Sequence, residues 1–140
     1  HNEMFHFTGN QPDGAGFAAC AAAIAATTGG RRVWLKGHGT GTLDAGKLEA
    51  EIFSRQFPEA PLTGWKGSLG HTLGSCGLVE LAVAVAAVRG GRIPGTVGAT
   101  SPTFSDNVAL ESFASAPFDG AILTSNAFGG AHAAMLLSHD

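Results

Sequence analysis

Two stretches of this 140-residue chain have the composition of helices but lack a polar face. Residues 14–28 are mostly alanine, and residues 74–89 carry one acid, Glu80, among small and aliphatic side chains. A helix at a protein surface normally keeps polar side chains on its outer face, so we expect both helices to lie between layers of structure. This chain is long enough for about one sheet, and we expect the second covering sheet to belong to another polypeptide segment.

The composition indicates a folded chain with little charge on its surface. Charged residues make up 14% of the chain, against about 25% in an average domain. The eight Lys and Arg form no basic stripe and the net charge is −3, which argues against nucleic acid as a partner. We expect no signal peptide and no membrane span. Cys20 and Cys76 lie in small-residue helices, which suits buried thiols in the cytoplasm.

Helices and strands alternate along most of the chain, which argues for an α/β fold in one domain over residues 1–140. The expected order is helix 14–28, strand 33–36, a helix from residue 44 or 45 to residue 57, strand 62–67, helix 74–89, loop 93–106, and strands 108–113, 121–125 and 133–137.

The first candidate site is the run Lys36-Gly-His-Gly-Thr-Gly-Thr42. His38 follows a predicted strand at its carboxyl end, where ligands collect in α/β folds. Thr40 and Thr42 add hydroxyl groups to the same loop. A glycine-rich turn with a hydrogen-bonded histidine is the alternative interpretation, whereas a dinucleotide loop fits poorly because a third glycine is absent.

A second run, Lys66-Gly-Ser-Leu-Gly-His71, repeats this arrangement ahead of the helix at 74–89. The positive end of a helix disfavours a protonated imidazole, and a neutral His71 can donate an N–H to a developing oxyanion. Two such histidines suit a thioester carbonyl that becomes an enolate. Lys66 and Glu49 could pair behind them, although an ordinary salt bridge explains that pair equally well.

Other chemistries fit these residues less well. His38 and His71 with Asp44 or His132 match no zinc spacing, so we expect no metal site. Cys76 lies inside an apolar helix, where a thiol is usually inert packing. We therefore expect Cys76→Ala to have no chemical effect and to cost at most about 1 kcal/mol of packing.

A third glycine-rich run lies between two predicted strands, at residues 125–132. Phe128 stands beside Gly129, where bare backbone can approach a ligand. From local sequence alone, we favour a tight hairpin with Phe128 in the core.

In this order, the three runs resemble the C-terminal half of a β-ketoacyl-[acyl carrier protein] synthase. The similarity rests on the His38-Gly-Thr-Gly-Thr42 run, on Lys66 with His71 five residues later, and on the Phe128 segment. Phe5-His-Phe-Thr, Pro12-Asp-Gly14 and Ile93-Pro-Gly-Thr extend it to about residues 4–138.

The resemblance implies a thiolase-like fold, in which two similar α/β halves form α-β-α-β-α layers. It implies decarboxylative Claisen condensation of acyl and malonyl thioesters in fatty acid or polyketide synthesis. The implied partners are the N-terminal half of the synthase, an acyl carrier protein, and a second subunit in a homo- or heterodimer. No resident cofactor is implied, since phosphopantetheine arrives on the carrier protein.

The resemblance also implies roles for individual residues. His38 and His71 would hold the malonyl thioester oxygen, and Lys66 and Glu49 would support them electrostatically. The phosphopantetheine arm would contact Thr40 and Thr42, and the gate beside the oxyanion hole would be formed by Phe128 and Gly129.

Three features depart from the family pattern. The nucleophilic Cys belongs to the N-terminal half, so we expect this chain alone to be inactive. Gly46 stands where the family usually has Asp, and the Phe128 segment is shorter, with His132 in place of its last Asn. These differences leave open a non-elongating subunit of the chain-length-factor type. Retention of His38 and His71 favours the elongating enzyme.

Overall fold

The computed structural model describes residues 2–4 and 14–138. Its elements are β1 (Asn2–Met4), α1 (Ala15–Ala25), β2 (Val33–Lys36), α2 (Leu43–Gln56), β3 (Leu62–Thr63), α3 (Lys66–Leu69), a 3-10 turn (Leu73–Ser75), α4 (Cys76–Arg89), β4 (Arg92–Ile93), β5 (Phe113–Ala114), β6 (Gly120–Ala127) and β7 (Ala131–Ser138). The Phe5 segment and Pro12, named above, lie outside the described residues.

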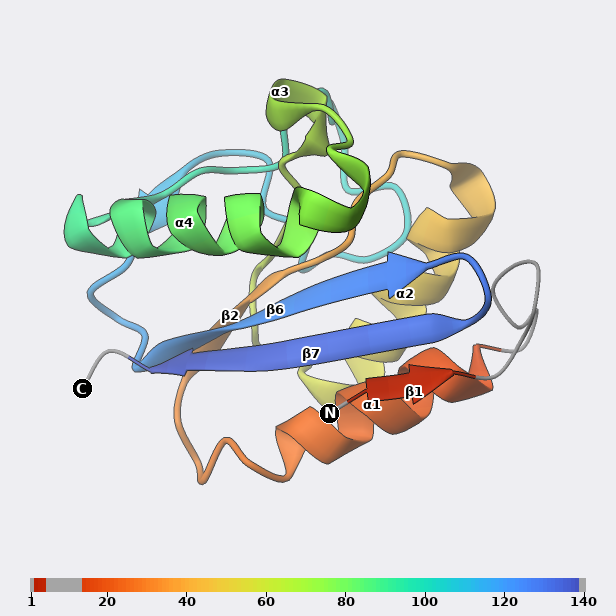
Figure 1. Cartoon of the computed structure of the whole chain (residues 1–140). Coiled ribbons are helices and arrows are strands. Elements are labelled where there is room, and N and C mark those ends of the chain that lie inside the picture. Colours follow the sequence, from red (N-terminus) through yellow and green to blue (C-terminus); the bar gives the residue numbers. More distant parts are fainter. Residues whose placement is uncertain (1, 5–13, 139–140) are drawn as a thin grey trace.

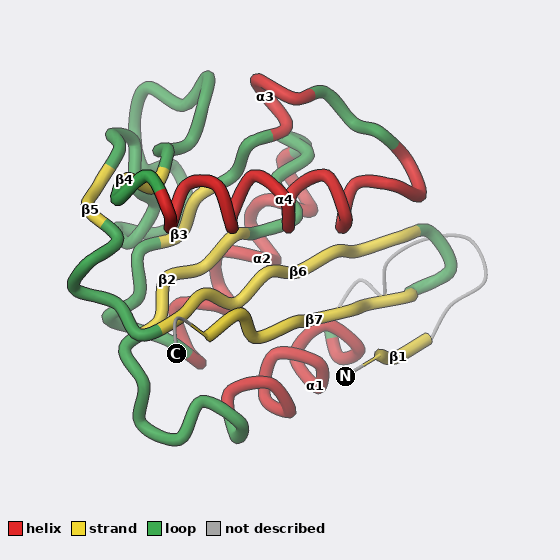
Figure 2. Tube along the Cα trace, turned by 60° about the vertical axis from the view of Figure 1, so that its left-hand side comes forward, coloured by secondary structure: helices red, strands yellow, loops and turns green. Residues whose placement is uncertain are grey.

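The described elements form three layers around a mixed sheet with the strand order β1-β7-β6-β2-β3 (Figures 1 and 2). β2 runs parallel to β3 and β6, whereas β7 is antiparallel to both β6 and β1. α1 and α2 pack together on one face, and α4 covers the other. This arrangement confirms the predicted α/β class.

Alternation along β2 divides the core between the two faces of the sheet. Val33 and Leu35 belong to the cluster formed with α1 and α2, whereas Trp34 packs in the cluster that includes Ala84 of α4. Because side chains in a strand point alternately to opposite faces, Lys36 belongs on the same side as Trp34. The sheet thus turns a buried lysine towards α4.

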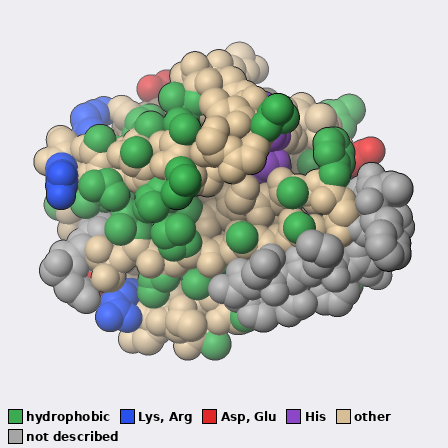
Figure 3. Space-filling view, in the orientation of Figure 1, with side chains coloured by type: hydrophobic (Ala, Val, Ile, Leu, Met, Phe, Trp, Pro, Cys, Tyr) green, Lys and Arg blue, Asp and Glu red, His purple; other side chains and the backbone are tan. Residues whose placement is uncertain are grey.

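α1 and α4 each cover one face of the sheet and each keep an exposed side, so their enclosure by a second sheet from another segment stays a prediction. The exposed positions of α1 include Ala15, Ala19 and Ala22, whose single methyl groups make little apolar surface. α4 buries only Cys76, Glu80 and Ala84, and Leu78 on its outer side is 72% exposed. Hydrophobic side chains gather over this helix and the neighbouring strands (Figure 3).

Two predicted strands differ from the structure. The strand expected at 62–67 ends at Thr63, and α3 begins at Lys66. The strand expected at 108–113 is replaced by an irregular segment with a single bridge from Val108 to Leu62, so that only β5 is regular. β1 falls in a segment for which we expected no strand.

Within the described ranges, no helix is long and apolar enough to cross a membrane.

Candidate active site

The loops after β2 and β3 bring the two predicted histidines together. The rings of His38 and His71 lie with their centroids 5.5 Å apart, almost perpendicular to each other. Gly39 has a φ of 59°, and a Cβ there would stand 3.1 Å from Gly64 Cα. Glycine at position 39 therefore lets these loops cross closely enough for the rings to meet.

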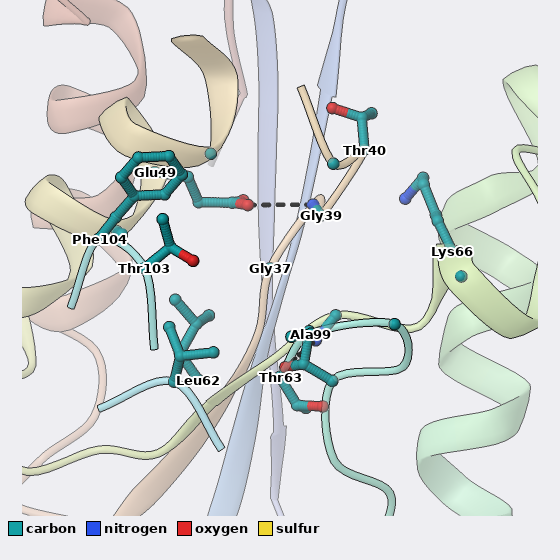
Figure 4. A pocket seen from close by; sticks show the side chains of 18 of the residues that line it. Gly37, Gly39, Thr40, Glu49, Leu62, Thr63, Lys66, Ala99, Thr103 and Phe104 are labelled. Atoms are coloured by element: carbon teal, nitrogen blue, oxygen red, sulfur yellow. Dashed lines mark hydrogen bonds between the residues drawn. The ribbon is translucent and has the colours of Figure 1, made fainter. Parts of the chain in front are cut away.

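Glu49 of α2 fixes the backbone that carries His38. The His38 N–H donates to Glu49 Oε1 (2.5 Å), and the Gly39 N–H donates to Oε2 (3.0 Å; Figure 4). Burial raises the pKa of Glu49, against the opposing effects of these two hydrogen bonds and of nearby lysine charges. The carboxylate of Glu49 thus clamps the loop.

The predicted pairing of Lys66 with Glu49 is wrong. Figure 4 shows Glu49 and Lys66 on opposite sides of the loop that carries Gly39. Lys66 Nζ instead lies 2.7 Å from Glu80 Oε1 and donates to the His38 carbonyl oxygen (2.5 Å). The lysine therefore reaches the back of the His38 loop while a carboxylate of α4 balances its charge.

Glu80 is the site residue that sequence reasoning missed. It lies between Cys76 and Ala84 on the one stripe of α4 that is buried, and it binds Lys36 as well as Lys66. Glu80 could have been found from the sequence because it is the only acid in an apolar helix, and a buried carboxylate requires a partner. The partners themselves come from distant segments and have no local signature.

The surroundings of His38 hold its imidazole neutral. Burial, followed by the charges of Lys66 and Lys36 and smaller effects of His71 and His132, lowers the pKa of His38 to about 3. The ring is 8% exposed, and its Nδ1 has no hydrogen-bond partner within residues 2–4 and 14–138.

The backbone after His71 sets the tautomer of its exposed ring. The Leu73 N–H donates to Nδ1 (3.1 Å), so Nδ1 carries a lone pair and the proton resides on Nε2. Leu73 adopts a φ of 53°, a left-handed conformation that is costly for a branched side chain. The turn thus presents His71 Nε2–H as a donor.

A pocket of about 580 Å³ opens beside His71. Thr40, Thr42 and Lys66 line it together with the segment from Thr96 to Phe104 (Figure 4). The hydroxyls of Thr40 and Thr42 are 3.3 Å apart. His38, Phe128 and Gly129 do not contribute to this lining.

A family profile described as "Beta-ketoacyl synthase, C-terminal domain" matches residues 1–100. This chain belongs to that family. It is 32% identical over 150 residues to the tetracenomycin polyketide synthase ketoacyl synthase alpha subunit of Streptomyces glaucescens, covering 98% of this chain and 34% of the relative. It is 28% identical over 149 residues to 3-oxoacyl-[acyl-carrier-protein] synthase 2 of Coxiella burnetii, covering 97% and 35%.

A ketosynthase of Xenorhabdus doucetiae, solved in complex with its chain length factor, matches the structure with a TM-score of 0.81 at 21% identity. The match covers 98% of this chain and 37% of the solved one, and it confirms the thiolase-like fold of a C-terminal half. This β-ketoacyl synthase domain spans about a third of the length of the relatives that it matches.

The structure shows the surroundings of Gly46 and His132, at which this β-ketoacyl synthase domain departs from the family pattern. A Cβ at Gly46 would lie 3.2 Å from the ring of Phe104, so Phe104 occupies the space beside the position where the family usually has Asp. His132 is buried on β7, where its Nδ1 lies 2.8 Å from Asn126 Oδ1. Burial lowers the pKa of His132.

Phe128 lies in the turn between β6 and β7 and is 91% exposed. The prediction of a tight hairpin is confirmed, but the prediction of a core Phe is wrong. Its role as a gate, with Gly129, stays a prediction.

No three His, Cys, Asp or Glu side chains of the described segments are grouped to hold a metal ion.

Cys76 contacts His71, contrary to the expectation that its thiol only fills space. Its Sγ lies 3.3 Å from His71 Nδ1, and Thr72 Oγ1 donates to the sulfur (3.4 Å). With the Thr72 hydroxyl as donor to the sulfur, the S–H can share the single lone pair of Nδ1 with the Leu73 N–H, as a weaker second contact.

We expect Cys76→Ala to move the ¹⁵N resonance of His71 Nδ1, because it loses a donor, and to lower the free energy of unfolding by about 1 kcal/mol. Cys76→Ser keeps a donor and should return the resonance towards its parent position. Cys20→Ala, at a buried thiol in α1, is the control and should leave it unmoved. An unmoved resonance in Cys76→Ala would show that the thiol is packing alone.

Proposed function

We propose that this chain is the C-terminal half of a β-ketoacyl-[acyl carrier protein] synthase, which condenses acyl and malonyl thioesters in fatty acid or polyketide synthesis. The observation that carries this proposal is the edge-to-face pair of histidines, with ring centroids 5.5 Å apart, and the bond from Lys66 to the carbonyl oxygen of His38. His71 also lines the pocket of about 580 Å³, in which we place the thioester arm.

In the proposed reaction, His71 Nε2–H and an N–H of the neutral His38 donate to the oxygen of the malonyl thioester. The bond between the α-carbon and the carboxylate breaks, CO₂ leaves, and the electron pair forms an enolate on the thioester. Donors placed where negative charge develops lower the barrier of such a step. The α-carbon then attacks the acyl carbonyl on a Cys of the N-terminal half, and the Cys thiolate leaves.

The other site residues take supporting parts in this proposal. Glu49 holds the His38 loop through two backbone hydrogen bonds, and Lys66 strengthens the positive field behind it. Thr40 and Thr42 contact the phosphopantetheine arm, which arrives on the carrier protein, so the domain holds no cofactor of its own. Phe128 and Gly129 form the gate next to the acyl site.

The proposed partners are the N-terminal half of the synthase and an acyl carrier protein, in a dimeric, cytoplasmic assembly. The outer side of α4, with Leu78 exposed, provides the apolar face for the N-terminal half. The Coxiella burnetii relative is named for its carrier-protein substrate, which supports the second partner.

The deciding experiment incubates the complete protein that carries this chain with acyl- and malonyl-carrier protein. A β-ketoacyl product with CO₂ release supports the elongating synthase. The shortened Phe128 segment leaves open the alternative, a chain-length-factor-type partner. Such a subunit would form no product alone and would support condensation only when mixed with a separate ketosynthase.

A further inference from the structure

Lys36 is a buried cation to which the proposed reaction assigns no role. It ends β2, is 1% exposed, and lies two residues before His38. Its ammonium binds Glu80 of α4 and donates to the Thr124 carbonyl oxygen of β6 (3.1 Å). A lysine is almost never buried to this degree unless it is paired.

Glu80 is shared between two lysines rather than held by one. Its Oε2 contacts Lys36, and its Oε1 contacts Lys66, with both lysines almost fully buried. Since Lys66 also reaches the His38 carbonyl oxygen, the Lys36–Glu80–Lys66 chain ties β2, α4 and α3 together directly behind the histidine pair.

These three residues and Glu49 form what we call the buried charge cluster. Its formal charge is zero when both lysines are protonated and both carboxylates ionised. The carboxylate of Glu49 is engaged by backbone N–H groups on the far side of the His38 loop. The side of the loop that faces Lys66 therefore carries two positive charges against the one carboxylate of Glu80.

We propose that Lys36 is a positioning residue of the site, which holds Glu80 jointly with Lys66 and supplies a second positive charge behind His38. This charge stabilises the negative oxygen that develops between the histidines, a part of the inference that rests on the proposed function. Removing the charge of Lys36 leaves the cluster with a net charge of −1, which favours a proton on His38.

The charged and titratable groups that act on His38 come from every side of the loop. They are Lys36 on β2, Lys66 on α3, Glu49 on α2, His71 before α4 and His132 on β7. Burial and the two lysine charges lower the pKa of His38, so losing one lysine charge raises that pKa. Burial lowers the pKa of Lys36 itself, while its bond to Glu80 favours the ammonium form.

The test follows the titration of His38 by NMR in the complete protein and in three variants. Lys36→Gln keeps a donor for Glu80 but removes the charge, and we expect it to raise the proton affinity of His38 about tenfold. Lys36→Arg keeps the charge and should stay near the parent. Lys47→Gln, at an exposed lysine of α2, should match the parent.

An unchanged His38 titration in Lys36→Gln would overturn the proposal. A Lys36→Gln protein that fails to fold, while Lys36→Arg folds, would also overturn it, because Lys36 would then be a structural residue.

A second measurement tests the consequence for catalysis. The rate at which Lys36→Gln releases CO₂ from malonyl-carrier protein should fall about tenfold. The acid limb of the pH–rate profile for CO₂ release should move to higher pH. Lys36→Arg should restore most of the rate. An unchanged rate and acid limb would refute this part. If the parent released no CO₂, the proposed function would fail, and the histidine titration would still decide the role of Lys36.

Discussion

His38→Ala and His71→Ala should each slow CO₂ release from malonyl-carrier protein about a hundredfold or more in the complete synthase. In the proposed reaction, each variant removes one of two donors to the oxygen on which negative charge accumulates. The two rings lie edge to face with their centroids 5.5 Å apart, and in the proposed reaction one thioester oxygen accepts from an N–H of each. The double variant should lose less than the sum of the single losses in activation free energy, because both groups act on one atom.

Transfer of the acyl primer onto the nucleophilic Cys provides the internal control for these variants. That step forms no enolate, so acyl-enzyme formation should suffer much less than CO₂ release. His71→Gln adds a matched comparison, because its amide retains an N–H donor without an imidazole, and it should fall between the parent and His71→Ala. Release of CO₂ at the parent rate by both Ala variants would contradict the donor pair.

The positions of the two histidines could be predicted because their signals are local. A His flanked by glycines after a strand, and another just before a helix, mark the edge of a sheet where the carboxyl ends of the strands lie side by side. The structure places both rings there. The structure places Glu49 against the His38 loop, but its shortest hydrogen bonds are to backbone N–H groups, which no side-chain pattern encodes.

The partner of Lys66 could not be predicted in the same way. Glu80 meets Lys36 and Lys66 only after α4 has packed across the sheet, and that packing depends on contacts distant in sequence. Which helix lies between two sheets could not be predicted for another reason. A helix of alanines has the same pattern whether it is enclosed or lies outside a sheet, because a methyl group tolerates both settings.

Loss of Glu80 should have the largest effect on stability. Glu80→Gln leaves Lys36 and Lys66 buried without the carboxylate that both of them bind, and we expect the free energy of unfolding to fall by about 3–5 kcal/mol. An uncompensated buried charge costs more than the lost attraction alone, since both ammonium groups have already given up water. Denaturant unfolding of the complete protein measures the loss.

The control is Glu51→Gln, which removes a carboxylate from the exposed surface of α2, where it lies 3.9 Å from both Lys47 and Arg55. Solvent screens these pairs, so this change should cost less than about 1 kcal/mol. The deficit of Glu80→Gln should also shrink as the pH rises towards about 10, where lysines lose their charge. A loss in Glu80→Gln no larger than in Glu51→Gln would mean that the two buried lysines do not depend on Glu80 for their compensation.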